Sequence, residues 1–238
     1  MEIKILKDVL GVNDQQAKEN RSLLDEAEVT ALNITASPGA GKTSIIMQTI
    51  QRLKERVRFG VIEGDVSSSI DAERVRNEDI PVVQINTGGA CHLDAAMVKI
   101  ALSNLPLKEI DLLIIENVGN LICPASFALG ENKNVLIASV PEGDDKPYKY
   151  PLMFAQADAV LLNKIDLLPY TDFEMDAFTR GVRNLNEKAQ IFKISCKTGE
   201  GVESWTEWVL AQLDKTVKGA VLQRPRQARH VSWQVFSS

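Results

Sequence analysis

The chain has 238 residues, of which 45% are hydrophobic and 25% charged, a composition typical of a globular protein and sufficient for one α/β domain with short appendages. Its formal net charge of −5 argues against a general nucleic-acid-binding protein, because such proteins need clustered cations. The N-terminus lacks the apolar core of a signal peptide, and no apolar run approaches the length of a membrane span. We therefore expect a cytoplasmic protein that binds neither nucleic acid nor membrane.

The first 28 residues are mostly polar, with a short helical pattern near Ala17 to Leu24. We interpret residues 1–28 as an N-terminal arm. From residue 29 to about 216, apolar runs with the length of strands alternate with amphipathic helical patterns, as in one continuous domain. The predicted strands span residues 30–36, 58–63, 81–86, 110–116, 134–140, 158–163 and 190–195. Residues 217–238 show no convincing period, and we interpret them as a flexible C-terminal tail.

The helical patterns between these strands each place apolar residues on one side. The predicted buried faces consist of Ile46, Thr49, Ile50 and Leu53; of Leu93, Met97, Ile100 and Ala101; and of Met175, Phe178, Val182 and Leu185. Continuously apolar strands such as Leu112 to Ile115 need cover on both faces, which is typical of parallel sheets. The pattern predicts a three-layer α/β fold with a mostly parallel, doubly wound sheet, and with ligands at the carboxyl ends of the strands.

A phosphate-binding loop is predicted directly after the first strand, where the chain reads Ser37-Pro-Gly-Ala-Gly-Lys-Thr43 and a helical pattern begins. Glycine at positions 39 and 41 lets backbone N–H groups approach phosphate oxygens, which a Cβ atom would obstruct. Lys42 is the predicted cation for the β and γ phosphates, and Thr43 is the predicted hydroxyl ligand of Mg²⁺. The predicted nucleotide-binding residues here are Gly39, Ala40, Gly41, Lys42, Thr43 and Ser44.

One position departs from the phosphate-loop pattern, since Ala36 stands where a glycine is usual. Alanine fits there if its φ angle is negative. The alternative interpretation is a glycine-rich turn that binds nothing. The strand before the motif and the helix after it favour the phosphate loop, which makes the predicted domain of residues 29–216 a P-loop NTPase.

Two further strands lead into carboxylates that can hold Mg²⁺. One continues into Glu63-Gly-Asp65, where we predict a magnesium-side role for Asp65, while Glu63 has the alternative of a capping or surface acid. The other ends in Glu116, with Gly119 three residues later, and resembles the D-x-x-G step of GTPases with Glu in place of Asp. In that step the acid holds Mg²⁺ through water and the glycine N–H contacts the γ-phosphate. The predicted catalytic residues are Lys42, Asp65 and Glu116.

Two thiols and an imidazole form a second candidate site, with Cys91 and His92 after one predicted strand and Cys123 after another. Such ligands suit Ni²⁺ or Zn²⁺ rather than Mg²⁺. The spacing alone also fits a buried cysteine beside a capping imidazole. Metal binding is favoured because both cysteines follow nucleotide-site strands and His92 is the only histidine before the tail. Three ligands are an incomplete set, which points to a site shared across a two-fold axis.

The motif Asn163-Lys-Ile-Asp166 follows an apolar strand and predicts guanine recognition. The Asp166 carboxylate can accept hydrogen bonds from N1–H and the exocyclic amine of guanine, whereas adenine presents neither donor there, so GTP is favoured over ATP. After the next strand, Ser195-Cys-Lys197 resembles the backbone loop that GTPases place against the guanine carbonyl. The predicted base-side residues are Asn163, Lys164, Asp166, Ser195, Cys196 and Lys197.

The order of these motifs resembles that of the hydrogenase nickel-incorporation GTPases, a family of dimerising SIMIBI-type GTPases. The resemblance covers about residues 8 to 215, and its segments read S-P-G-A-G-K-T, E-G-D, G-G-A-C-H, I-E-N-V-G-N-L-I-C-P, P-E-G-D-D-K-P-Y-K-Y-P, N-K-I-D and S-C-K-T-G-E-G. The related urease accessory GTPases usually have C-P-H where this chain has Cys91 and His92. They usually have E-S-G-G-D-N where this chain has the segment that begins at Glu116. This chain has C-H and E-N-V-G-N at those places.

The resemblance implies a cytoplasmic homodimer that uses GTP and Mg²⁺ and passes nickel to [NiFe]-hydrogenase precursors. It implies two protein partners, a hydrogenase nickel-insertion accessory protein and the hydrogenase large-subunit precursor. The family's interface ligands for Ni²⁺ or Zn²⁺ correspond to Cys91, His92 and Cys123. Some relatives also carry a cysteine-rich N-terminal nickel motif or a histidine-rich stretch. This chain carries neither, so high-affinity nickel storage is not expected.

We expect slow GTP hydrolysis that rests on positioning and charge neutralisation, because the sequence offers no obvious water-orienting glutamine or arginine finger. In the SIMIBI pattern a lysine of the neighbouring chain reaches the γ-phosphate, and Lys146 in Gly-Asp-Asp-Lys-Pro is the candidate. Three alternatives stay open: a urease-type or other SIMIBI metallochaperone, a P-loop small-molecule kinase using ATP, and a metal carrier whose GTP site is only structural. The guanine motif argues against the kinase.

Overall fold

A seven-stranded sheet forms the centre of the computed structural model, which describes residues 9–65, 78 and 80–213. The strand order is β3-β2-β4-β1-β5-β6-β7, and every neighbouring pair is parallel. The strands are β1 (Thr30–Ala36), β2 (Phe59–Asp65), β3 (Val82–Asn86), β4 (Leu112–Glu116), β5 (Lys133–Ser139), β6 (Ala159–Asn163) and β7 (Gln190–Lys193). Every strand overlaps its predicted range, and the predicted doubly wound α/β fold is confirmed.

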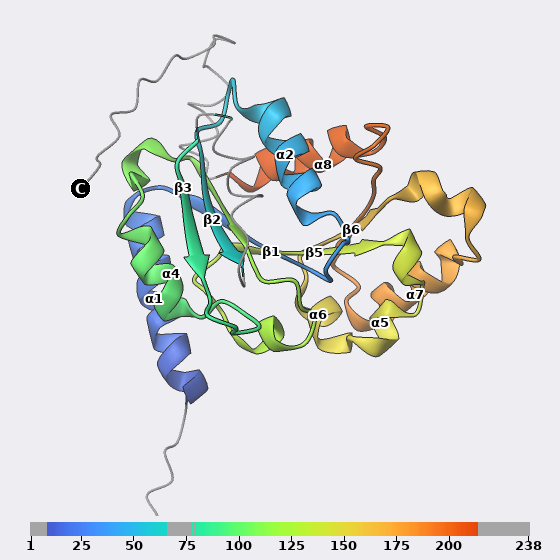
Figure 1. The fold of residues 1–238 in the computed structure, drawn as a ribbon, viewed down its shortest axis with the longest axis horizontal. Helices are drawn as coiled ribbons and strands as arrows, with labels where there is room; N and C mark the ends of the chain where they lie inside the picture. Colours follow the sequence, from blue (N-terminus) through green and yellow to red (C-terminus); the bar gives the residue numbers. More distant parts are fainter. Residues whose placement is uncertain (1–8, 66–77, 79, 214–238) are drawn as a thin grey trace, which may run out of the picture.

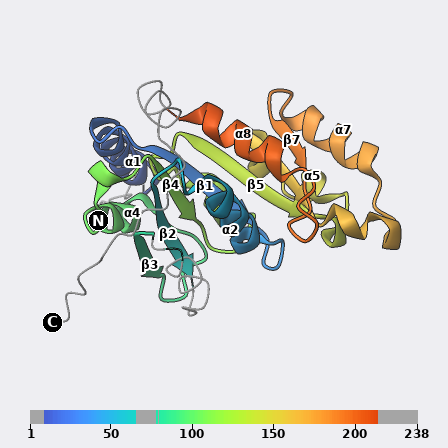
Figure 2. The ribbon, with the colours of Figure 1, turned by 90° about the horizontal axis from the view of Figure 1, so that it is seen from above.

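Helices cover both faces of the sheet (Figure 1). On one face lie α2 (Lys42–Leu53) and α8 (Val202–Gln212). The opposite face is covered by α1 (Val9–Glu26), α4 (Ala95–Leu102), α6 (Pro151–Gln156) and α7 (Met175–Leu185). Viewed from above, α1 and α4 lie toward one edge of the sheet and α7 toward the other (Figure 2). The shorter helices are α5 (Lys146–Lys149), η1 (Leu107–Glu109), η2 (Cys123–Ser126), η3 (Val140–Glu142) and η4 (Ile165–Tyr170).

The alternation of side chains along each strand explains the continuous apolar runs. In β4, Leu112 and Ile114 belong to the core beneath α2 and α8, whereas Leu113 and Ile115 belong to the core beneath α1 and α4. All five residues of β4 are buried. By the same alternation, the last residue of the strand, Glu116, lies on the face of the sheet that α2 covers.

Helix α1 is longer than the short pattern expected in the N-terminal arm, because it extends over Val9–Glu26. It packs along α4 in both views, and Leu24 is fully buried in their shared core. The predicted C-terminal tail, residues 217–238, lies outside the described residues. Among the helices that the structure describes, none has the length and apolarity needed to cross a membrane.

The predicted helix faces are only partly correct. Ile46, Thr49, Ile50 and Leu53 are all buried in α2, as predicted. In α4 the prediction was wrong for Ile100, which is 67% exposed, because the helix buries Ala95, Val98, Ala101 and Leu102 instead. The cause is that α4 begins only at Ala95, with Asp94 as its N-cap, so Leu93 is buried from the preceding loop and belongs to no helix face.

Candidate functional site

The phosphate loop joins the carboxyl end of β1 to the start of α2. Gly39 and Gly41 have φ angles of 78° and 101°, which favour glycine. A Cβ atom on Gly41 would also lie 2.4 Å from Nδ2 of Asn163. Ala36 is buried at the end of β1 and is not among the described residues with positive φ, which meets the condition for alanine at that position. Since α2 begins at Lys42, the N–H groups of its first turn and its positive dipole end face the loop.

The guanine motif, which begins at the last residue of β6, makes hydrogen bonds to this loop. The Asn163 side-chain amide donates to the Ala40 carbonyl at 2.9 Å, and the Lys164 ammonium donates to the Gly39 carbonyl at 2.6 Å. Lys164 adopts a left-handed conformation with φ 61°. The sequence indicated that Asn163 and Lys164 contact the nucleotide, but not that their side chains also bond the carbonyls of the phosphate loop. Phosphate loop and guanine motif are therefore one connected unit.

A cavity of about 660 Å³ lies beside the loop and is lined by predicted residues from both ends of the nucleotide site. They are Gly41, Thr43, Ser44, Asn163, Lys164, Asp166, Cys196 and Lys197. The cavity also contacts Met47, Gln48 and Gln51, which the sequence analysis did not identify. Their signal was the helical spacing, since Met47 and Gln48 follow Ser44 by three and four residues and Gln51 follows Gln48 by three, which puts them on the same face of α2.

Two side chains position the base-side motifs relative to one another. The Ser195 hydroxyl donates a 2.6 Å hydrogen bond to Oδ1 of Asp166, which leaves the other carboxylate oxygen for a ligand. The backbone N–H of Cys196 donates to Oδ1 of Asn163 at 3.4 Å. Burial raises the pKa of the Cys196 thiol to about 11, with the Asp166 charge as a smaller cause, so this cysteine is an inert wall of the cavity at neutral pH.

The magnesium-side residues meet at the Glu116 carboxylate. The Thr43 hydroxyl donates to Oε1 of Glu116 at 3.2 Å, and Nζ of Lys42 lies 4.0 Å from the same oxygen. A hydroxyl and a carboxylate beside a phosphate loop are oxygen ligands of the kind Mg²⁺ prefers, so these residues fit the ion. Gly119 lies against this loop, since a Cβ atom there would be 3.2 Å from the Pro38 ring.

The acids of β2 differ from the sequence interpretation in one respect. Glu63 is only 4% exposed, so the alternative of a surface acid is wrong. It is the register partner of Glu116 in the parallel pair of β2 and β4, which places both carboxylates on the α2 face of the sheet. Asp65 ends β2, and its side chain lies outside what the structure describes.

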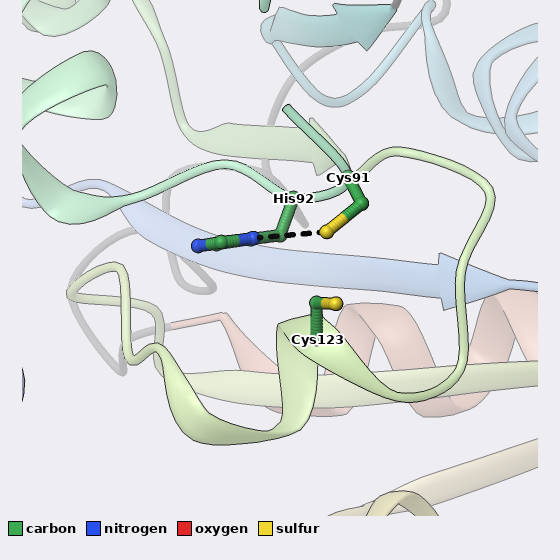
Figure 3. A group of neighbouring side chains, drawn as sticks. All are labelled: Cys91, His92 and Cys123. Carbon is green, nitrogen blue, oxygen red and sulfur yellow. Dashed lines mark hydrogen bonds between the residues drawn. The ribbon is translucent and has the colours of Figure 1, made fainter. Parts of the chain in front are cut away.

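Cys91 and His92, between β3 and α4, come together with Cys123, the first residue of η2, at the carboxyl edge of the sheet (Figure 3). One ligand atom from each lies within 4.8 Å of the others, and Sγ of Cys91 is 3.6 Å from Nδ1 of His92. Cys91 is exposed, and the other two are partly buried. Hydrogen bonding with Cys123 raises the pKa of the Cys91 thiol, because a negative charge on one sulfur is unfavourable beside the other. A bound cation would neutralise that charge.

Three residues that the sequence analysis did not identify hold this cluster. The Phe127 ring packs on the His92 ring with centroids 3.9 Å apart. Asn120 donates from its amide to the Cys91 carbonyl at 3.3 Å, and Asn117 accepts from the N–H of Leu93 at 3.1 Å. An asparagine or phenylalanine in a loop gives no sequence signal of such a role without the contact itself.

Helix α1 ties together the segments that follow the two metal loops. Asn13 accepts from the N–H of Ala95 and donates to the carbonyl of Ala128, both at 2.9 Å. Asn20 donates to the carbonyls of Ala95 and Leu129, at 2.8 and 2.9 Å. Each asparagine therefore bridges the start of α4, after His92, and the loop after Phe127.

Lys146, the predicted trans-acting lysine, is engaged within its own chain. Its Nζ atom lies 3.2 Å from Oε1 of Glu142 and 5.1 Å from the centre of the Tyr150 ring. The side chains of Lys146 and Glu142 are both 15% exposed. A role at a neighbouring chain's nucleotide would require this ion pair to open.

The sheet that carries these sites matches one known family of nucleotide-binding proteins. A family model described as "CobW/HypB/UreG, nucleotide-binding domain" matches residues 30–193. The chain belongs to the CobW/HypB/UreG family. The match extends from the first residue of β1 to the last of β7 and confirms the predicted P-loop GTPase class.

Within the CobW/HypB/UreG family, the chain is similar to hydrogenase maturation factors. It is 46% identical to the hydrogenase maturation factor HypB of Azotobacter vinelandii over 227 residues, 95% of this chain and 75% of that one. The crystal structure of HypB from Archaeoglobus fulgidus matches with a TM-score of 0.81 and 40% identity, over 86% of this chain and 100% of that one. HypB from Helicobacter pylori in complex with nickel matches with a TM-score of 0.81 and 38% identity, over 86% and 96%.

Proposed function

We propose that this protein is a GTP-hydrolysing metallochaperone that delivers nickel, as cargo, during maturation of [NiFe]-hydrogenase in the cytoplasm. The observation that carries the proposal is the cluster of Cys91, His92 and Cys123 on segments adjoining the nucleotide-binding edge. Two thiols and an imidazole form a set suited to a soft or borderline divalent ion. The similarity to HypB, including one structure with nickel, supports the identity of that ion.

GTP is the proposed nucleotide because Asp166 is positioned by Ser195 with one carboxylate oxygen left for the base. Thr43 and Glu116, together with Asp65, are the proposed residues that hold Mg²⁺, which supplies charge neutralisation at the phosphates when bound. Lys42 stabilises charge that develops on the transferred phosphoryl group. Hydrolysis by positioning and charge alone is expected to be slow.

The metal site is proposed to be completed by a second copy of the chain. Three ligands leave at least one position of a four-coordinate ion open, and Cys91 is exposed, so the cluster faces outward. Two clusters facing one another across a two-fold axis would enclose the ion. If GTP favours that dimer, nucleotide and metal affinity must influence each other reciprocally. Lys146 is the proposed residue that reaches the partner's γ-phosphate once its pair with Glu142 opens.

Delivery requires protein partners that take the ion from the cluster. We propose a hydrogenase nickel-insertion accessory protein and the hydrogenase large-subunit precursor, because similarity to hydrogenase maturation factors covers most of the chain. The test is a nickel titration followed by absorbance and by the mass of the assembly, with GDP and then with a non-hydrolysable GTP analogue. Metal-dependent dimerisation that is stronger with the analogue is expected. If assembly mass and nickel affinity are the same with both nucleotides, the proposed switch is wrong.

A further inference from the structure

The segment 116–123 contacts both candidate sites. Its first residue, Glu116, accepts the hydrogen bond of Thr43. Its glycine, Gly119, packs against Pro38 of the phosphate loop. Its last residue, Cys123, belongs to the metal cluster. Eight consecutive residues therefore connect the nucleotide site to the metal site.

Asn117 lies inside this segment and is fully buried. One atom of its carboxamide accepts from two backbone N–H groups, of Leu93 at 3.1 Å and Val118 at 2.9 Å. Because only an oxygen can accept from two donors, the orientation of the amide is fixed. Its nitrogen donates to Oδ1 of Asn33 at 3.3 Å, and its main-chain N–H donates to the Ile34 carbonyl at 3.0 Å. Asn117 is anchored to β1 and holds the residue that follows His92.

Asn120 makes the corresponding contact on the other side of Gly119. Its Oδ1 atom accepts from the N–H of Ile122 at 2.8 Å, which forms a local turn, and its amide donates to the Cys91 carbonyl at 3.3 Å. The loop carrying Cys91 and His92 is therefore bonded to the segment at both ends, by Asn117 after His92 and by Asn120 at Cys91.

We propose that Asn117 and Asn120 are positioning residues that couple nucleotide state to metal affinity. Gly119 lies between them, and its N–H is the group expected to contact a γ-phosphate. A shift of the main chain at Gly119 would move both asparagines, and their hydrogen bonds would carry the movement to Cys91 and Leu93, on either side of the metal-binding imidazole. The proposal rests on the proposed function, because it presumes GTP at the phosphate loop and a metal at the cluster.

A purely structural role for the two asparagines makes a different prediction. If they only held the loop in shape, their removal would weaken metal binding by the same factor with GDP and with a GTP analogue. If they couple the sites, removal changes the ratio of the two affinities. That ratio is the coupling itself, and a change in fold stability alone does not move it.

The experiment measures Ni²⁺ affinity by competition with a chromophoric chelator, with GDP and with guanosine 5′-(β,γ-imido)triphosphate. Asn120→Asp keeps the acceptor for Ile122 but replaces the amide that donates to Cys91 by a carboxylate oxygen. Asn117→Ala removes the contact to Leu93, and its thermal unfolding shows whether it folds. The matched control is Asn104→Asp, because Asn104 is exposed beyond the far end of α4 and its amide donates to a carbonyl of that helix.

Allosteric coupling in proteins is commonly about 5- to 150-fold, and we expect a wild-type affinity ratio on that order. In Asn120→Asp and in folded Asn117→Ala the ratio should fall to within about twofold of one, while Asn104→Asp keeps the wild-type ratio. Asn120 variants that keep the wild-type ratio would overturn the proposal and leave the proposed function intact. Equal loss of affinity in both states would also overturn it. A wild-type ratio of one would instead refute the nucleotide-regulated metal site, and the coupling role with it.

Discussion

The Thr43 hydroxyl donates a 3.2 Å hydrogen bond to Oε1 of Glu116, so the first turn of α2 and the last residue of β4 meet at one carboxylate. Lys42 approaches the same oxygen to 4.0 Å. A triphosphate would attract Lys42 and Mg²⁺ would compete for Glu116, so ligands must rearrange this small network when they enter. Substitutions in it should therefore affect the chemistry more than the fold.

Replacing Lys42 with alanine should reduce the rate of GTP hydrolysis by roughly 10²- to 10³-fold, because one preorganised charge at the phosphates is lost. Phosphate release measures the rate, and far-UV circular dichroism should be unchanged. The control is Lys54→Ala, at the opposite end of α2, where an exposed lysine pairs with Glu78. Wild-type turnover in the Lys42 variant would contradict the assigned role.

Replacing Asp166 with asparagine should remove the preference for guanine. The variant keeps the acceptor for the Ser195 hydroxyl but loses the charged oxygen that pairs with the base. Loss of a hydrogen bond to a charged group predicts a decrease in GTP affinity of roughly 10- to 100-fold. Xanthosine triphosphate, with a carbonyl in place of the exocyclic amine, should bind the variant better than the wild type. Unchanged competition between GTP and ATP would show that guanine is recognised elsewhere.

Metal affinity should fall as the pH is lowered. The pKa of the Cys91 thiol is raised by its hydrogen bond with Cys123, so at neutral pH the thiol keeps its proton until a metal displaces it. Each displaced proton makes the affinity rise about tenfold per pH unit while the pH is below that pKa. Nickel titrations between pH 6 and pH 8 measure the slope.

The same titrations test the ligands. Cys91→Ala and Cys123→Ala should weaken nickel binding and flatten its pH dependence, because a displaced proton is removed with each thiol. The matched control is Cys196→Ala, since Cys196 lines the nucleotide cavity and lies outside the cluster. If nickel affinity is unchanged in Cys91→Ala and Cys123→Ala, neither cysteine is a ligand.

Replacing Asn20 with alanine should destabilise the protein. Asn20 is fully buried, and its amide satisfies the carbonyls of Ala95 and Leu129. Losing this buried donor to two carbonyls predicts a loss of about 1–3 kcal/mol in the free energy of unfolding, measurable by urea titration. Asn104→Ala is the control, because that side chain is exposed and its loss should cost less than about 0.5 kcal/mol. An equal effect of both changes would show that the α1 contacts are weak.

The strands and the nucleotide motifs could be predicted because each has a local signal. β4 is a continuous apolar run whose two faces are both covered, and the phosphate loop requires glycine at Gly41, where a Cβ atom would meet Asn163. The register of one strand against its neighbour could not be predicted, because it has no local signal in the sequence. The position of Glu63 beside Glu116 depends on how β2 pairs with β4, which no pattern within either strand contains.

The supports of the metal cluster could not be predicted for a related reason. Asn117, Asn120 and Phe127 act through contacts with a loop more than twenty residues away in the sequence, and their residue types are common in loops. Ile100 was misplaced because the helical period was extended back to Leu93, before the N-cap that starts α4. Local periodicity identified the elements, whereas long-range hydrogen bonds determined the site.

The bridges made by Asn13 and Asn20 have a consequence for the minimal unit that can carry a metal. The family match begins at residue 30, after α1 has ended, and every recognised motif lies beyond it. A truncated chain that starts at residue 30 would retain the nucleotide pocket and all three metal ligands. It would lose the hydrogen bonds by which α1 joins the backbone after His92 to the backbone after Phe127. The affinity for the metal ion thus depends on a helix that contributes no ligand.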